Sequence, residues 1–171
     1  MKRASLALAA MLSLAASATP LKSHCEIPCG IYDDALRAKL IDEHIGTVAK
    51  SMEQIQALSK APPAERNYNQ LVRWVSNKEA HAGEIQHIVT QYFLTQRVKP
   101  ADPADAAAYK KYVAQLTLLH RMLVHSMKAK QGTDPAEVKT LRSTWATFRA
   151  AYFGASAKAG AGGGDHAGHH H

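Results

Sequence analysis

Four long stretches of the chain repeat apolar residues at intervals of three and four, and this periodicity is what most limits the possible fold. The stretches span about residues 34–60, 67–98, 104–130 and 135–153. Each places an apolar stripe on one side of a helix, and the alternation typical of strands is absent from the sequence. We therefore predict an all-α protein in which residues 34–153 form an antiparallel, up-down four-helix bundle.

Residues that start or stop helices separate these stretches. Asp33 and Asp34 supply an N-cap and a first-turn acid, and Asp134 is a cap followed by Pro135 at the first helical position. The other breaks fall at Pro62, Pro63, Pro100, Pro103 and Gly132. The stripes nominate as core residues Leu36, Leu40, Ile41, Ile45, Val48, Met52, Ile55, Leu58, Leu71, Val72, Val75, Ile85, Ile88, Val89, Tyr92, Phe93, Tyr112, Val113, Leu116, Leu119, Leu123, Val138, Leu141, Trp145, Phe148 and Tyr152.

The first 23 residues have the pattern of a leader. A short basic start precedes an uncharged run of Ala, Leu, Ser and Met, and Ala16 and Ala18 give an A-x-A cleavage pattern. The apolar run is too short to span a membrane. We therefore predict a removable signal peptide over residues 1–23, a mature protein without membrane attachment, and export to the periplasm or outside the cell. A cytoplasmic protein with a specifically cleaved leader is the alternative.

The opposite end and the overall charge set further limits. Residues 154–171 consist mainly of Ala, Gly, Ser and His, a composition that cannot bury a core and predicts a disordered tail. The net charge is +7, and it falls to 18 − 14 = +4 without Lys2, Arg3 and Lys22 of the predicted leader; this excess is spread over the helices. A dense basic stripe with interleaved aromatics is missing, so we do not expect nucleic-acid binding, although the mild excess could steer a small anion.

Both cysteines of the chain lie in one short segment directly after the leader. Residues 24–33 read His-Cys-Glu-Ile-Pro-Cys-Gly-Ile-Tyr-Asp, so that Cys25 and Cys29 are four apart and Pro28 stiffens the loop between them. This segment resembles the N-terminal hook of nickel superoxide dismutases, H-C-x-x-P-C-G-x-Y, at every fixed position. The helices also resemble that family, over about residues 24–153.

The resemblance implies a nickel ion, one per subunit, that cycles between its divalent and trivalent states as it converts superoxide to dioxygen and hydrogen peroxide. It implies that Cys25 supplies a thiolate and its backbone amide, that Cys29 supplies the second thiolate, and that His24 supplies its α-amine and an axial imidazole. Thiolates and square-planar N/S coordination suit divalent nickel. It also implies a homohexamer, with Tyr32 closing over the metal.

Outside the hook the resemblance transfers less completely. Tyr92 matches a second gating tyrosine, but the lysine that follows it in the actinobacterial pattern is replaced by a segment ending in Arg97. Asp42 or Glu43 is the candidate for a carboxylate that supports the axial imidazole. The arginine partner of that carboxylate has no clear match.

Three other readings compete with a nickel centre. Cys25 and Cys29 could form a disulfide, the usual fate of a cysteine pair in an exported protein. Glu84 and His87 have the spacing of half a di-iron site, but residues 109–130 contain no acid to complete it. A non-enzymatic exported carrier of nickel or copper could use the hook and the His-rich tail without turnover.

The proposed role of the His24 α-amine limits where the leader can be cleaved. The bond after Ala18 is the favoured signal-peptidase site, but the α-amine of His24 exists only if cleavage falls after Ser23. We therefore expect a maturation protease to make or complete this cut.

Overall fold

The computed structural model describes residues 32–154, and all of its regular elements in that range are helical. The main helices are α2 (Asp34–Ser59), α3 (Tyr68–His87), α4 (Ala106–Gln131) and α5 (Pro135–Phe153). A short 3-10 turn, η1 (Pro63–Glu65), follows α2, and a π-helix, η2 (Ile88–Arg97), continues α3. The prediction of an all-α protein is confirmed for these residues. The predicted leader and nearly all of the predicted tail lie outside them.

The helix ends follow the capping residues of the sequence. Asp33 accepts a hydrogen bond from the backbone N–H of Leu36 at 2.8 Å, and Asp134 accepts one from Ala136 at 2.9 Å. Asn67 caps α3 in the same way through Gln70, at 3.0 Å. These side chains satisfy amide groups that have no partner within their own helix. The predicted starts at residues 34, 67 and 135 are therefore confirmed to within one residue.

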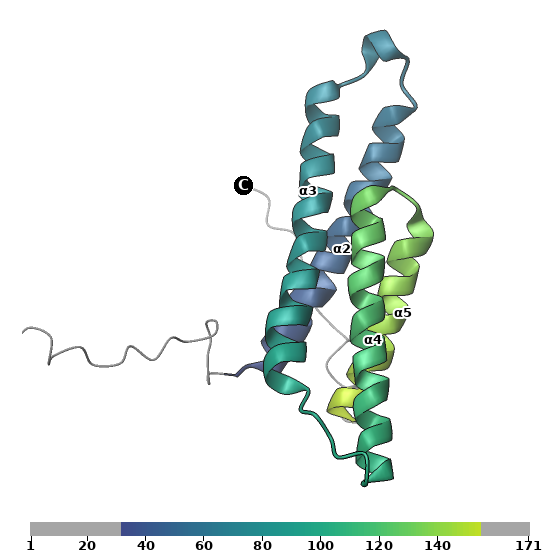
Figure 1. The fold of residues 1–171 in the computed structure, drawn as a ribbon. Helices are drawn as coiled ribbons and strands as arrows, with labels where there is room; N and C mark the ends of the chain where they lie inside the picture. The colour runs from purple at the N-terminus through teal and green to yellow at the C-terminus, as the bar shows by residue number, and fades with distance from the viewer. Residues whose placement is uncertain (1–31, 155–171) are drawn as a thin grey trace, which may run out of the picture. The chain divides into compact units, whose positions relative to one another are not determined.

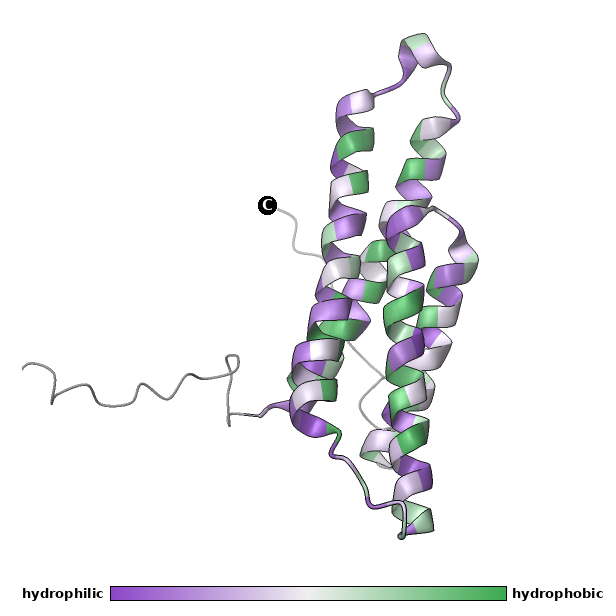
Figure 2. Ribbon diagram, in the orientation of Figure 1, coloured by the Kyte–Doolittle hydropathy of each residue, from purple (hydrophilic) through white to green (hydrophobic). Residues whose placement is uncertain are grey.

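The four helices lie side by side around one apolar core (Figure 1). Green and purple positions alternate along every helix in Figure 2, as expected for stripes that face a shared interior. α2 packs most extensively against α3, and α4 against α5, whereas α2 and α5 share the smaller interface. The largest fully buried side chains come from all four helices and include Ile41, Met52, Phe93, Leu119, Met122, Trp145 and Phe148.

A few of the nominated core residues are exposed. Val72 is 62% exposed, Leu36 47% and Val113 41%. In Figure 1 the start of α3 and the end of α2 extend beyond the loop that joins α4 to α5. Val72 is the fifth residue of α3, near the start of that helix. Apolar periodicity identifies a helix face, but coverage of that face depends on the length of its neighbours.

The last ten residues of the second helical stretch differ from the prediction. We expected one continuous α-helix over residues 67–98, but from Ile88 to Arg97 the chain winds as a π-helix. The backbone N–H of Val98 donates to the carbonyl of Phe93 at 2.8 Å, an i to i−5 bond. Such wider turns are uncommon and frequently lie at functional sites.

Within residues 32–154, no helix combines the length and the apolar character needed to cross a membrane.

Candidate functional site

The predicted nickel ligands His24, Cys25 and Cys29 lie outside the described residues. Of the predicted hook, residues 24–33, the structure describes Tyr32, whose side chain is exposed, and Asp33, which caps α2. A boundary between two structural units falls between these two residues. In the sequence, the predicted hook directly precedes α2, so the described part of the candidate site begins at the first turn of that helix.

Asp34, the first residue of α2, is the centre of a polar network that we call the Asp34 cluster, formed by Asp34, Tyr92, Arg97 and Tyr152. The Tyr92 hydroxyl donates to Oδ1 of Asp34 at 2.6 Å, and the Tyr152 hydroxyl donates to Oδ2 at 2.9 Å. Arg97 donates to both oxygens at 2.8 Å, a two-pronged ion pair. One carboxylate thus joins the start of α2 to the ends of η2 and α5.

The cluster has a fixed charge state at neutral pH. Burial opposes the charge of Asp34, but hydrogen bonds from Arg97, Tyr92 and Tyr152 outweigh it and lower the pKa of the carboxyl below its usual value. Burial and the hydrogen bond to Asp34 raise the pKa of Tyr92 far above that of an ordinary phenol, and the pKa of Tyr152 is raised by the same causes. Asp34 is therefore ionised, while both tyrosines keep their protons.

The π-helix explains how Tyr92 and Arg97 reach the same carboxylate. They are five residues apart, and an α-helix would turn their side chains about 140° away from each other. Hydrogen bonding between residues five apart instead brings successive turns into register at that spacing. The unusual winding of η2 is therefore what allows both side chains to bind Asp34.

The ring of Tyr92 is held as firmly as its hydroxyl. The guanidinium of Arg37 lies 5.4 Å from the centroid of this ring, within the range of a cation–π contact. On the core side the edge of Phe93 meets it, with centroids 5.2 Å apart. Tyr92 is itself 3% exposed. Two arginines thus flank a nearly buried tyrosine close to the first turn of α2.

The carboxylates predicted to support the axial imidazole have different surroundings. Asp42 accepts a hydrogen bond from the indole N–H of Trp145 at 2.9 Å and pairs with Arg149 at 2.7 Å. Glu43 is exposed. Asp42 lies eight residues after Asp34, about 12 Å along the helix axis. Both of these partners of Asp42 are on α5. For Asp42 and Glu43 alike, support of the His24 imidazole stays a prediction.

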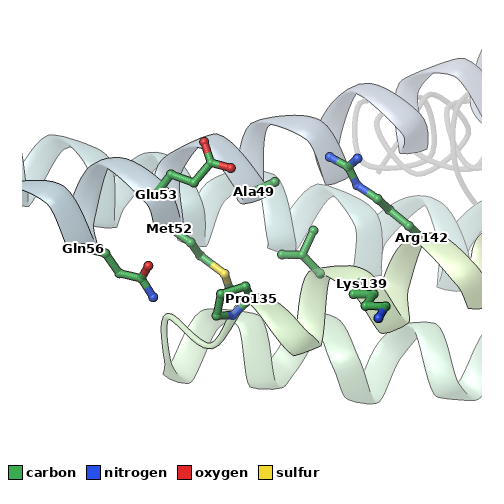
Figure 3. Close-up of a pocket in the computed structure, with 8 residues that line it drawn as sticks. Ala49, Met52, Glu53, Gln56, Pro135, Lys139 and Arg142 are labelled. Carbon is green, nitrogen blue, oxygen red and sulfur yellow. The ribbon is translucent and has the colours of Figure 1, made fainter.

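Two surface hollows lie along the α2–α5 interface. One, of about 330 Å³, separates Met52 and Gln56 of α2 from Pro135 and Arg142 of α5 (Figure 3). The other, of about 290 Å³, includes Asp42 and Arg149. Neither contains a member of the Asp34 cluster. They reflect the limited packing of α2 against α5 rather than the chemistry at the start of α2.

Comparison with known families identifies the family of the chain. The model of the family described as nickel-containing superoxide dismutase matches residues 16–156, which is most of the chain. The chain belongs to the nickel-containing superoxide dismutase family. The search of curated proteins and the search of solved structures gave no significant match. As a member of this family, the protein is an oxidoreductase that disproportionates superoxide and uses a nickel cofactor.

The sequence predicts Tyr92 as a gating residue, and this role stays a prediction. It indicates only a first-turn acid at Asp34, a departure from the family pattern at Arg97 and a core residue at Tyr152, so the other members of the cluster are not predicted as site residues. The sequence offers one signal for the cluster, the five-residue spacing of Tyr92 and Arg97. This spacing places the two side chains on one face only in a π-helix, which the sequence does not predict.

Proposed function

We propose that this nickel superoxide dismutase holds its metal with His24, Cys25 and Cys29, and that the Asp34 cluster fixes Tyr92 as a gating residue next to that hook. The donor set carries the metal assignment: two thiolates and nitrogen donors suit divalent nickel in a square-planar site. When bound there, nickel supplies the one-electron redox step of dismutation. The remaining work falls to residues of the chain itself.

Chain connectivity supports the closeness of the hook and the cluster. Cys29 precedes Asp34 by five residues, and a fully extended chain of that length spans at most about 18 Å. The Cα atoms of Cys29 and Asp34 therefore lie within about 18 Å of each other. Tyr32 lies between them in the sequence, which suits its proposed part as the other gating tyrosine.

The charge state of the cluster limits what Tyr92 can do. Dismutation joins two superoxide anions and two protons to give one dioxygen and one hydrogen peroxide. Because the pKa of Tyr92 is far above neutral and its hydroxyl already donates to Asp34, Tyr92 is a poor source of those protons. Its role is to shape the approach to the metal, and the nearby guanidinium of Arg37 favours entry of a small anion, whereas the charge of Arg97 is balanced by Asp34.

We extend the proposal to the assembly and its processing. We infer that the helices form an antiparallel, up-down bundle, since consecutive helices pack together and short connections join them. Exposed apolar side chains such as Leu36, Tyr109 and Val113 suit burial between subunits, in keeping with a homohexamer. A maturation protease would expose the amine of His24 after removal of a leader, in an exported protein.

The hook assignment is tested on natively matured protein from nickel-replete cells. N-terminal sequencing should begin at His24, and the protein should contain one nickel per chain. Cys25→Ser and Cys29→Ser should each lose nickel and superoxide consumption while the circular dichroism of the helices is retained. Ile27→Val, a change between the two cysteines at a position the motif leaves open, is the matched control and should keep both.

Two results would contradict this assignment. One is a mature chain that begins at Thr19, in which His24 has no α-amine. The other is dismutase activity that survives the loss of either cysteine. Oligomeric state is measured separately by light scattering of the loaded protein.

A further inference from the structure

Two histidines from different helices meet in the α2–α3 interface, apart from the Asp34 cluster. Nδ1 of His44 on α2 lies 2.8 Å from Nδ1 of His81 on α3, with ring centroids 5.0 Å apart and ring planes inclined by 59°. Both residues are half-buried, so one side of the pair is open to solvent. The nitrogens are held by two helices that share the most extensive interface of the unit.

The separation of these nitrogens fits one kind of metal coordination. A metal–imidazole bond is about 2.0–2.1 Å long, so two nitrogens at adjacent corners of a square stand about 2.9 Å apart, against about 3.4 Å at a tetrahedral centre. The observed 2.8 Å is the length of an N–H···N hydrogen bond between the two rings, and it is also closer to the square arrangement than to the tetrahedral one. Divalent copper and nickel favour this tetragonal geometry with nitrogen and oxygen ligands, whereas zinc favours the tetrahedral one.

The protonation of the pair also suits a metal ion. Burial, and then the charge of His81, lower the pKa of His44, while the nearby carboxylates Glu84 and Glu43 act in the opposite direction. His44 is therefore neutral at physiological pH, and only one of the two rings can donate between the facing Nδ1 atoms. A metal ion needs the lone pairs of both Nδ1 atoms, so neither Nδ1 carries a proton when the metal is bound.

We propose that His44 and His81 form a second transition-metal site, in addition to the hook, that binds one divalent copper or nickel ion through their two Nδ1 atoms as cis ligands. Within residues 32–154, no group of three or more His, Cys, Asp or Glu side chains could hold a metal ion. Water therefore completes the coordination, on the solvent side of the pair. The charges of Glu84 and Glu43 attract the cation without binding it directly.

The test uses the full chain with the competing metal ligands removed. This background carries Cys25→Ser, Cys29→Ser and His24→Ala in the hook, and alanine at His166, His169, His170 and His171. Equilibrium dialysis against Cu²⁺ should give one ion per chain, and its electron paramagnetic resonance spectrum should show coupling to two imidazole nitrogens. Neither readout depends on dismutase activity, so failure here leaves the hook assignment intact.

Single substitutions in this background decide between a metal site and a simple hydrogen bond. His44→Ala and His81→Ala should each weaken Cu²⁺ binding by about tenfold or more. His81→Gln keeps a polar side chain in the interface, protects the fold, and should weaken binding equally. His120→Ala removes an exposed histidine of α4 and should change nothing. Absence of stoichiometric Cu²⁺ in the background, or unchanged affinity in folded His81→Gln, would overturn the proposal.

Discussion

Asp34 and Lys78 are both charged side chains removed largely from water, but the protein compensates their charges in different ways. The Asp34 side chain is 19% exposed and is bound by side chains alone: a guanidinium and two phenols from two other elements. Lys78 is 3% exposed, and its ammonium donates to the backbone carbonyls of Ala129, Lys130 and Gly132 at 2.6, 2.6 and 3.0 Å.

This difference indicates that Lys78 has a structural role, whereas Asp34 belongs to the candidate functional site. The carbonyls that Lys78 binds are those that a helix leaves unpaired at its C-terminal end, where the helix dipole also favours a cation. Lys78 therefore caps the C-terminal end of α4 and connects α3 to it. The Asp34 cluster instead orients the hydroxyl of a tyrosine at the first turn of α2. We expect changes at Lys78 to affect stability alone, and changes at Asp34 to affect both stability and dismutation.

The largest loss of stability should follow Asp34→Ala. It leaves the Arg97 guanidinium and two phenols without their shared acceptor, which costs about 2–4 kcal/mol of the free energy of unfolding. Chemical denaturation monitored by circular dichroism measures this value. A loss below that of an ordinary surface ion pair, about 1 kcal/mol or less, would show that the cluster does not hold the helices together.

Lys78→Met should cost slightly less, about 2–3 kcal/mol, because it removes charged hydrogen bonds but keeps the aliphatic packing of the side chain. Activity per bound nickel should stay at the wild-type value, since Lys78 touches no member of the Asp34 cluster. Denaturation and a superoxide assay on the same samples make the comparison. A fall in activity per nickel equal to that of Asp34→Ala would erase the distinction between the two residues.

Acid titration should separate the two charges further. The folded pKa of Asp34 lies below its unfolded value of 3.8, so its contribution to stability is present above that value and is lost as pH falls through the folded pKa. The stability difference between wild type and Asp34→Asn should therefore shrink below pH 3.8. The corresponding difference for Lys78→Met should stay constant there, because a lysine does not titrate in acid. Denaturation curves at several pH values test both statements.

Arg97→Lys should have the smallest effect, about 1 kcal/mol of stability. A lysine keeps the charge but replaces the two-pronged contact to Asp34 with a single one. Tyr92 and Tyr152 would still find their acceptor, so activity should fall only a few-fold. A loss of activity as large as that of Asp34→Ala would mean that Arg97 acts on the substrate itself rather than through Asp34.

Much of this fold could be predicted from local sequence because local interactions decide it. Asp33, Asn67 and Asp134 cap helices within three residues of themselves, and α2, α3 and α5 begin where these residues indicate. The sequence does not indicate the change to a π-helix after His87, and α4 begins two residues later than predicted. Val72 shows a further limit, since it lies on an apolar stripe but is 62% exposed.

The candidate site shows the same division. The proposed hook is predicted from one window of the sequence, because its candidate donors and its turn residues are contiguous. The Asp34 cluster could not be assembled in that way, because residues 34, 92, 97 and 152 come from three elements. Its formation depends on the winding of η2, and a π-helix differs from an α-helix in no residue type that the sequence displays.

The central claim, that Asp34 serves dismutation by positioning Tyr92, is tested most directly by a double-mutant cycle. The value of kcat/KM per bound nickel is measured for wild type, Asp34→Asn, Tyr92→Phe and the double variant. If Asp34 acts through Tyr92, the double variant should be no slower than the slower single variant. Losses that multiply in the double variant would contradict the account, because the two residues would then act independently.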